Sequence, residues 1–408
     1  MSERPLDTSI AHVRFDRVFR FGSILGAIGS ALSPTRIGIG MFTLALLVGG
    51  GRIWDAATTP EPSSASASLM TGLINAVTPG EDPEPVAPFQ FTLDQVQSCG
   101  SRLIDATVGL EPAAFLAAGR DLLWTTPASL WNGGHHWFIL LFGLWTAASL
   151  ALGGGVLCRL EAVGLATRDA ASVNPALGMV AGRWQAFFAA LLMPLVMAAL
   201  LALLLLVFGL VLLNAPVLNL LGAVLYGAAL LVGLGIALLL LAYAVSCPLL
   251  LPAVAAENCD GPDAMHRAIA YIVAKPLRWM LYLFTLMLGL ALGLLLVLTV
   301  ANLTIDITAA LVDQWTFNET FASAQAATEG GEAPDASWHV AWAGGLVSFW
   351  SGLVQWAVAG WVVAYLMAGS TRAYLLLRLA CDGQDEREIW WPGLIRGTLA
   401  PEPPNSQE

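Results

Sequence analysis

Three long apolar stretches with almost no ionisable residues constrain this chain more than any other feature. Trp184 to Leu213 and Val217 to Cys247 contain no Asp, Glu, Lys or Arg, and a third stretch runs from Leu277 to Asn302. An apolar run of about 18 or more residues is long enough to cross a bilayer as a helix. Charged residues make up only 12% of the chain, against about 25% in an average soluble domain. The sequence therefore predicts an integral membrane protein.

Three further apolar segments, at 35–53, 137–157 and 340–367, complete the set of spans. We therefore expect an all-α, polytopic helical bundle with six transmembrane helices. Its predicted segments are an amphipathic interfacial region 1–34, a first span 35–53, an outer Pro/Ser-rich linker with short helices 54–135, a four-helix bundle 136–303 with inner loops 159–183 and 248–276, an acidic outer segment 304–339, a sixth span 340–370 and a tail 371–408.

The distribution of charge orients this bundle. With six spans and a cytoplasmic N-terminus, 15 of the 18 lysines and arginines lie on the inner side, and the outer side carries 3 basic and 15 acidic residues. Short cytoplasmic loops of membrane proteins are enriched in Lys and Arg. We therefore predict that both termini are cytoplasmic and that the protein resides in the cytoplasmic (inner) membrane of a bacterium.

The first 34 residues have apolar side chains at helical spacing from Ile10 to Leu32, with arginines on the opposite side. Such a helix could lie on the membrane surface, or it could pack on the protein's own cytoplasmic face. Pro34 should end it. A signal peptide is disfavoured, because Ile53 and Trp54 stand where a cleavage site needs small residues. The candidate contacts with lipid headgroups are Arg14, Arg17, Arg20, Arg267, Lys275 and Arg278.

The outer segment after the first span changes character abruptly. Thr58 to Pro88 is rich in Pro, Ser, Ala and Glu and reads as a linker. Helical spacing resumes over Thr92–Thr107, and Pro112 suits the first turn of a helix through Trp124. We expect two short helices over the outer membrane face, with a re-entrant segment over 112–132 as the alternative.

Two inner loops resemble each other. Each loop follows a descending span and contains Ala-Val, an Asp, Ala-Leu or Ala-Met, and Arg-Trp before the next span; the loops are Leu160 to Trp184 and Leu251 to Trp279. This similarity between the two loops is consistent with an internal duplication of the kind found in many polytopic proteins. The alternative is that any two cytoplasmic loops between apolar helices share such features.

Few residues point to chemistry. Three carboxylates, those of Glu257, Asp260 and Asp263, lie close to His266 in the sequence and could perform acid–base work. An Asp before a helix is more often its N-cap, and here Asp263 would cap a helix over 264–274. His135, His136 and His339 could hold a metal ion, although histidines beside Trp are also typical of an interface belt. The absence of ionisable residues in the middle of the spans argues against an ion-coupled transporter. We assign no catalytic residue, cofactor or metal ligand, and the five cysteines imply no disulfide framework.

Pro248 to Trp279, with Pro252, Glu257, Gly261, Ala264 and Arg267, resembles the loop of bacterial membrane domains related to the membrane domain of glycerophosphodiester phosphodiesterases. Ala268-Ile269 stands where that family pattern has Ser-Trp. The segments 159–194 and 370–382 resemble uncharacterised six-span proteins of planctomycete-type bacteria. The resemblance implies a membrane-embedded helical domain and no catalytic residues.

These features favour a non-enzymatic component of the membrane, structural or accessory, that contacts lipid headgroups and a membrane-protein partner or a second copy of itself. The alternative is a permease or channel for an uncharged or lipid-like substrate. We expect no nucleic-acid partner. A membrane enzyme would require Glu257, Asp260 and His266 to converge in a pocket.

Overall fold

A computed structural model describes residues 20–58, 87–214, 216, 218–316, 320–321, 323–324 and 337–401. It is 87% helical, and the described part contains no strand. Six of its helices are long and apolar enough to cross a membrane, as the sequence predicts. They are α3 (Pro34–Thr58), α8 to α9 (His136–Thr167), α11 to η5 (Trp184–Leu213), α12 (Leu218–Glu257), α14 (Pro276–Asp313) and α16 (Trp338–Asp382).

The shorter elements fall between these spans. They are η1 (Arg20–Gly26), α2 (Ala27–Ala31), α5 (Pro88–Val108), α6 (Pro112–Arg120), η3 (Asp121–Thr125), α7 (Thr126–Asn132), α10 (Val173–Gly182) and α13 (Gly261–Ala274). The second span divides into α8 (His136–Ser149), a π-helical turn η4 (Leu150–Gly154) and α9 (Gly155–Thr167), and the third into α11 (Trp184–Phe208) and η5 (Gly209–Leu213). Prolines open α5, α6 and α14, where their missing N–H has no intrahelical partner to lose.

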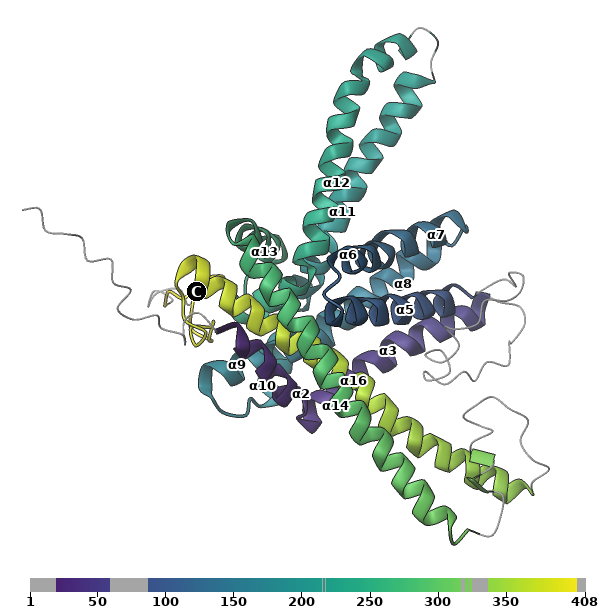
Figure 1. The fold of residues 1–408 in the computed structure, drawn as a ribbon. Coiled ribbons are helices and arrows are strands. Elements are labelled where there is room, and N and C mark those ends of the chain that lie inside the picture. Colours follow the sequence, from purple (N-terminus) through teal and green to yellow (C-terminus); the bar gives the residue numbers. More distant parts are fainter. Residues whose placement is uncertain are drawn as a thin grey trace, which may run out of the picture.

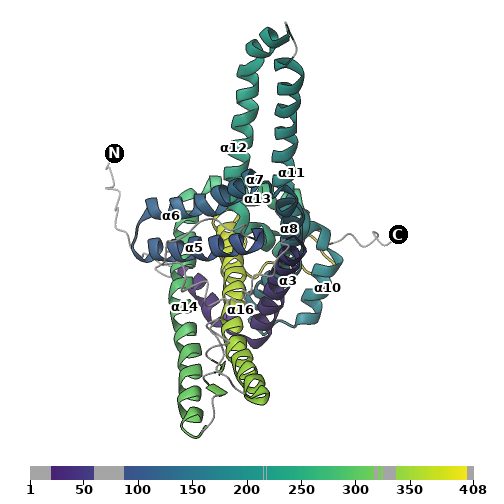
Figure 2. The same cartoon turned by 90° about the vertical axis from the view of Figure 1, so that its right-hand side faces the viewer.

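The spans form three hairpins that diverge from one shared region (Figure 1). The hairpins are α3 with α8–α9, α11 with α12, and α14 with α16. In both views α11 and α12 extend away from that region on the opposite side from α14 and α16 (Figure 2). Each hairpin is preceded by short helical elements, namely η1 with α2, then α10, then α13. The two inner loops that resemble each other in sequence therefore share one structural order, and the N-terminal segment repeats it a third time.

The shared region, called the base here, holds most of the buried core. It comprises η1, α2, α9, α10, α13, the starts of α11 and α14, and the C-terminal parts of α12 and α16. In α12 every residue from Leu249 to Glu257 is buried, whereas the preceding turns expose side chains such as Leu231. Its 40 residues correspond to about 60 Å of helix, roughly twice the thickness of the hydrocarbon core. The exposed apolar turns suit lipid, and the buried end extends beyond them.

Glycines set how closely the helices approach. A Cβ on Gly40 of α3 would collide with the carbonyl of Gly360 in α16, and a Cβ on Gly360 would meet the backbone of Met41. On α14, Cβ atoms on Gly289 and Gly293 would collide with Tyr365 and Trp361 of α16. The Gly-x-x-x-Gly spacing at Gly289 and Gly293 therefore serves a contact within the chain, a point the sequence leaves open.

The N-terminal segment packs on the protein itself where the structure describes it. Ile24, Ala27 and Ala31 are fully buried in the base core. Of the two arrangements that the sequence allowed, a helix on the membrane surface or a helix packed on the protein itself, η1 and α2 adopt the second. Pro34 separates α2 from α3, as predicted. Arg14 and Arg17 lie outside the described residues.

The segment between the first and second spans contains the predicted short helices. The helix expected over 92–107 begins earlier, at Pro88, and the Asp55 carboxylate accepts hydrogen bonds from the Phe89 and Gln90 backbone N–H groups (3.0 and 3.1 Å). Asp55 thereby satisfies two donors at the free end of α5. The second helix, α6, continues through a π-helical turn into α7. The linker over 59–86 lies outside the described residues.

The helix that contains the predicted sixth span extends beyond that span. Helix α16 continues past residue 370 to Asp382, where Gly383 adopts a left-handed conformation (φ 73°) that ends it. The sequence placed Arg372 and Arg378 in a tail, because charged residues ordinarily mark the end of a span. Both instead lie on α16, where Arg372 is largely buried and Arg378 fully buried, and each has a carboxylate to pair with.

Candidate functional site in the base

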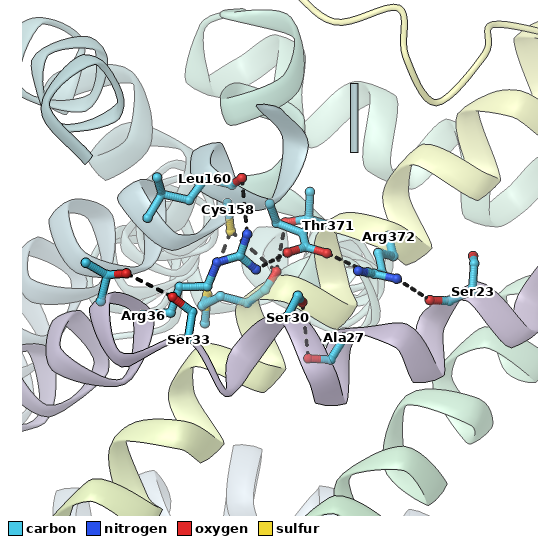
Figure 3. Close-up of polar contacts among 12 residues, drawn as sticks. Ser23, Ala27, Ser30, Ser33, Arg36, Cys158, Leu160, Thr371 and Arg372 are labelled. Atoms are coloured by element: carbon cyan, nitrogen blue, oxygen red, sulfur yellow. Dashed lines mark hydrogen bonds and ion pairs between the residues drawn. The ribbon is translucent and has the colours of Figure 1, made fainter. Parts of the chain in front are cut away.

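Two buried carboxylates organise the base. The first is Glu161 of α9, whose side chain is 1% exposed and forms ion pairs with Arg36 of α3 and with Arg372 of α16 (Nε to Oε1, 2.5 Å). Arg372 also donates to the Ser23 carbonyl of η1 (2.6 Å; Figure 3). A Cβ on Gly26 would collide with the Arg372 guanidinium, so the glycine leaves room for it. Glu161 and its two arginines therefore join four segments that are far apart in the sequence.

The second carboxylate is Glu257 at the end of α12, with a side chain 4% exposed. It forms an ion pair with Arg267 of α13 and accepts a hydrogen bond from the Tyr374 hydroxyl of α16 (2.5 Å). Arg378 of α16 is fully buried, and its Nη1 lies 3.7 Å from Glu257 Oε1. Each glutamate is thus shared by two arginines.

Two more arginines connect the loops 159–183 and 248–276. Arg159 of α9 is 4% exposed and donates to the Ala255 carbonyl at the end of α12 (2.9 Å). Arg183, just before α11, donates to the Asn258 side chain (3.2 Å) and pairs with Asp260 (2.5 Å), whose side chain is 70% exposed. These contacts connect the two loops that resemble each other in sequence.

The chain after α16 folds back over the base. We call residues 383–401 the C-terminal strap. The Trp390 N–H donates to the Ala256 carbonyl (2.7 Å), and the Gly397 N–H donates to the Glu257 carbonyl (3.1 Å). Ile389 is 1% exposed, and Arg159 lies over the Trp391 ring at 5.5 Å. The strap belongs to the packed structure up to Pro401, within the region predicted as a tail.

The carboxylates considered for acid–base chemistry do not act together. Glu257 is held by arginines and Tyr374, Asp260 by Arg183, and His266 is exposed. Helix α13 begins at Gly261 with Asp260 as N-cap residue, so the prediction that Asp263 caps this helix is wrong. Asp263 lies in the first turn, where its charge favours the helix N-terminus. Asp260 makes no side-chain capping bond, because its carboxylate faces Arg183.

The predicted headgroup contacts separate into two groups. Arg20, Lys275 and Arg278 are exposed, and no ion pair involves them within the described part of the chain. Arg267 instead turns inward to Glu257 and to the Gly397 carbonyl of the strap (2.8 Å). Its assignment as a headgroup contact stays a prediction, and in this structure the guanidinium is engaged by Glu257 and the strap.

The histidines make separate local contacts. The His136 ring contacts the Trp131 ring in a tilted arrangement with centroids 4.3 Å apart, and His339 lies within hydrogen-bond distance of Ser337 (3.2 Å). Among the described residues, no group of three or more His, Cys, Asp or Glu side chains is placed to hold a metal ion.

Burial also raises the pKa of two groups in the base, one in the loop after α12 and one on α13. It raises the pKa of the Tyr271 hydroxyl, assisted by the hydrogen bond that Tyr271 donates to Asp382. Burial, with the nearby charge of Glu257, raises the pKa of the Cys259 thiol to about 12. Both groups therefore stay neutral at physiological pH.

Sequence reasoning missed the base as a site. It used four residues of the base only for the charge that orients the topology, namely Arg159, Glu161, Arg372 and Arg378. Their one detectable signal is that each lies within a turn or two of a predicted span end. Spacing along the chain could not show that Arg36 and Arg372 meet at Glu161, since 125 and 211 residues separate them from it.

Comparisons with known proteins give no relative. No family model matches the chain, and neither a curated protein nor a solved structure resembles it significantly. The class of protein defined by the fold is a multi-pass helical membrane protein whose hairpins are joined through a buried arginine–glutamate base.

Proposed function

We propose that this protein is a non-enzymatic, structural or accessory component of a bacterial inner membrane, which contacts anionic lipid headgroups and a protein partner through its membrane body. One observation carries the proposal. The base separates its cations into buried arginines that pair with Glu161 and Glu257, and exposed Lys275 and Arg278 at the start of α14.

The buried pairs support a structural role. Glu161 and Glu257 are occupied by arginines from other helices, so neither is available as a base or a proton relay. Fixed ion pairs of this kind define which helices meet. A role in holding three hairpins together accounts for every contact that the two glutamates make.

The exposed cations support the contact with lipid. Lys275 and Arg278 lie at the inner end of a span under the predicted topology, where an anionic leaflet attracts basic residues by about 1 kcal/mol each. The apolar outer turns of the hairpins offer surface to lipid chains or to the spans of a partner. A permease or channel stays a prediction that the described residues do not test.

Lipid retention in nanodiscs tests the proposal. The Lys275→Gln/Arg278→Gln double variant should bind phosphatidylglycerol about tenfold or more weakly than the parent protein, because two basic contacts are lost. Native mass spectrometry of retained lipid measures this. Arg120→Gln, a 70% exposed arginine on α6, is the matched control and should retain lipid normally. Equal retention by the double variant and the control would refute the headgroup contact.

A further inference from the structure

The C-terminal strap covers three arginines that come from three different helices. Arg159 of α9 donates to the Trp390 carbonyl (2.9 Å), and Arg267 of α13 donates to the Gly397 carbonyl (2.8 Å). Arg378 of α16 donates to the carbonyls of Asp385 (3.1 Å) and Glu388. The strap thus meets all three guanidinium groups with backbone oxygens.

These three cations are not balanced by charge. Glu257 is the one carboxylate that pairs with them in the described structure, so the group carries a surplus of two positive charges. Arg378 is fully buried, yet its Nε and Nη1 have no hydrogen-bond acceptor there. A buried guanidinium with open donors is costly, because neutral carbonyl dipoles replace only part of its hydration.

The group suits a phosphoryl anion. Arginine presents a planar fork of donors that matches phosphate oxygens, and such charge-assisted hydrogen bonds are stronger than those to carbonyls. A phosphoryl group would bring both the charge and the additional acceptors that Arg378 lacks. Glu257 does not need to move, since Tyr374 and Arg267 already hold it.

The strap is held in a way that permits exchange. Its polar contacts with the base are the N–H groups of Trp390 and Gly397 and the carbonyls that accept from the three arginines, with Ile389 as the buried apolar anchor and Trp391 beneath Arg159. The acidic side chains of Asp385 and Glu388 are exposed and do not pair with the covered arginines. An anion would therefore compete with carbonyl oxygens and not with buried ion pairs of the strap.

We propose that Arg159, Arg267 and Arg378 form a binding site for a phosphoryl anion, that the strap occupies this site with its carbonyl oxygens, and that the anion displaces the strap. The inference rests on the proposed function in one respect, namely that the base faces lipid headgroups. It adds a second, covered site to the exposed contacts at Lys275 and Arg278.

Hydrogen exchange of the strap in the full chain tests this site. The protein is placed in phosphatidylcholine nanodiscs, in discs that also contain phosphatidic acid, or in phosphatidylcholine discs with pyrophosphate in solution. Amides of segment 389–397 should exchange about tenfold faster when the anion binds, because Trp390 and Gly397 lose their acceptors. A response to phosphatidic acid alone identifies a lipid headgroup, and a response to pyrophosphate as well identifies a free phosphate.

Two arginine-to-glutamine variants provide the comparison. Arg267→Gln should abolish the response, whereas Arg120→Gln, which removes the same charge from an exposed position on α6, should retain it. Unchanged exchange of the parent protein with both anions would overturn the proposal, as would loss of the response in Arg120→Gln. If Arg267→Gln does not fold, the parent protein and Arg120→Gln still decide the matter. Because lipid retention is measured separately, failure of this site is distinguishable from failure of the exposed headgroup contacts.

Discussion

Glu161→Gln should be strongly destabilising, because it removes the one counter-ion that Arg36 and Arg372 share. Both arginines are largely buried, with side chains 12% and 13% exposed. Removing one partner of a buried ion pair costs about 3 to 5 kcal/mol, since the remaining charge stays in a poorly solvating environment. Glutamine preserves the volume of the side chain, so this loss reports on charge and not on packing. Reversible unfolding in mixed detergent micelles, followed by circular dichroism, measures it.

Asp260→Asn is the matched control within the base. Asp260 also pairs with an arginine, but its side chain is 70% exposed, so the loss should stay below about 1 kcal/mol. The triple variant Arg36→Met/Glu161→Leu/Arg372→Met should recover most of the stability, because apolar residues of similar volume often replace a buried ion network without loss. The reasoning is refuted if Glu161→Gln is no more destabilising than Asp260→Asn.

Three further predictions concern packing, titration and topology. Gly40→Leu should destabilise the crossing of α3 with α16 by about 1 to 3 kcal/mol in the same unfolding assay, whereas Gly38→Leu, where a Cβ meets open space, should be nearly neutral. Because burial raises the pKa of Cys259 to about 12, iodoacetamide at pH 8.5 should label this thiol more than about a hundredfold more slowly in the folded protein than in dodecyl sulfate. The thiol ionises at lower pH in the unfolded chain than in the folded protein, so the free energy of unfolding should fall as the pH rises from about 8.5 to 12. Lys275→Cys should react with an impermeant maleimide only after the cells are opened, and Arg120→Cys in intact cells; labelling of Lys275→Cys in intact cells would contradict the predicted topology.

The sequence predicted the fold class and the six candidate spans, because a charge-free apolar run has few alternatives to a membrane helix. It also anticipated α6 from Pro112 and the break at Pro34. It did not show that helix α16 continues beyond the predicted span to Asp382. From the sequence, Arg372 and Arg378 are typical of a tail outside the membrane, because the carboxylates that pair with them are distant in the chain.

The sequence by itself determined that six helices are apolar enough to lie in lipid and that the basic residues collect at one end of them, since both properties follow from composition along the chain. Only the tertiary structure decided that Glu161 and Glu257 are each shared by two arginines and that the strap covers Arg159 and Arg378. The physical reason is that transfer into lipid depends on a segment's own residues, whereas the stability of a buried charge depends on which distant residue meets it.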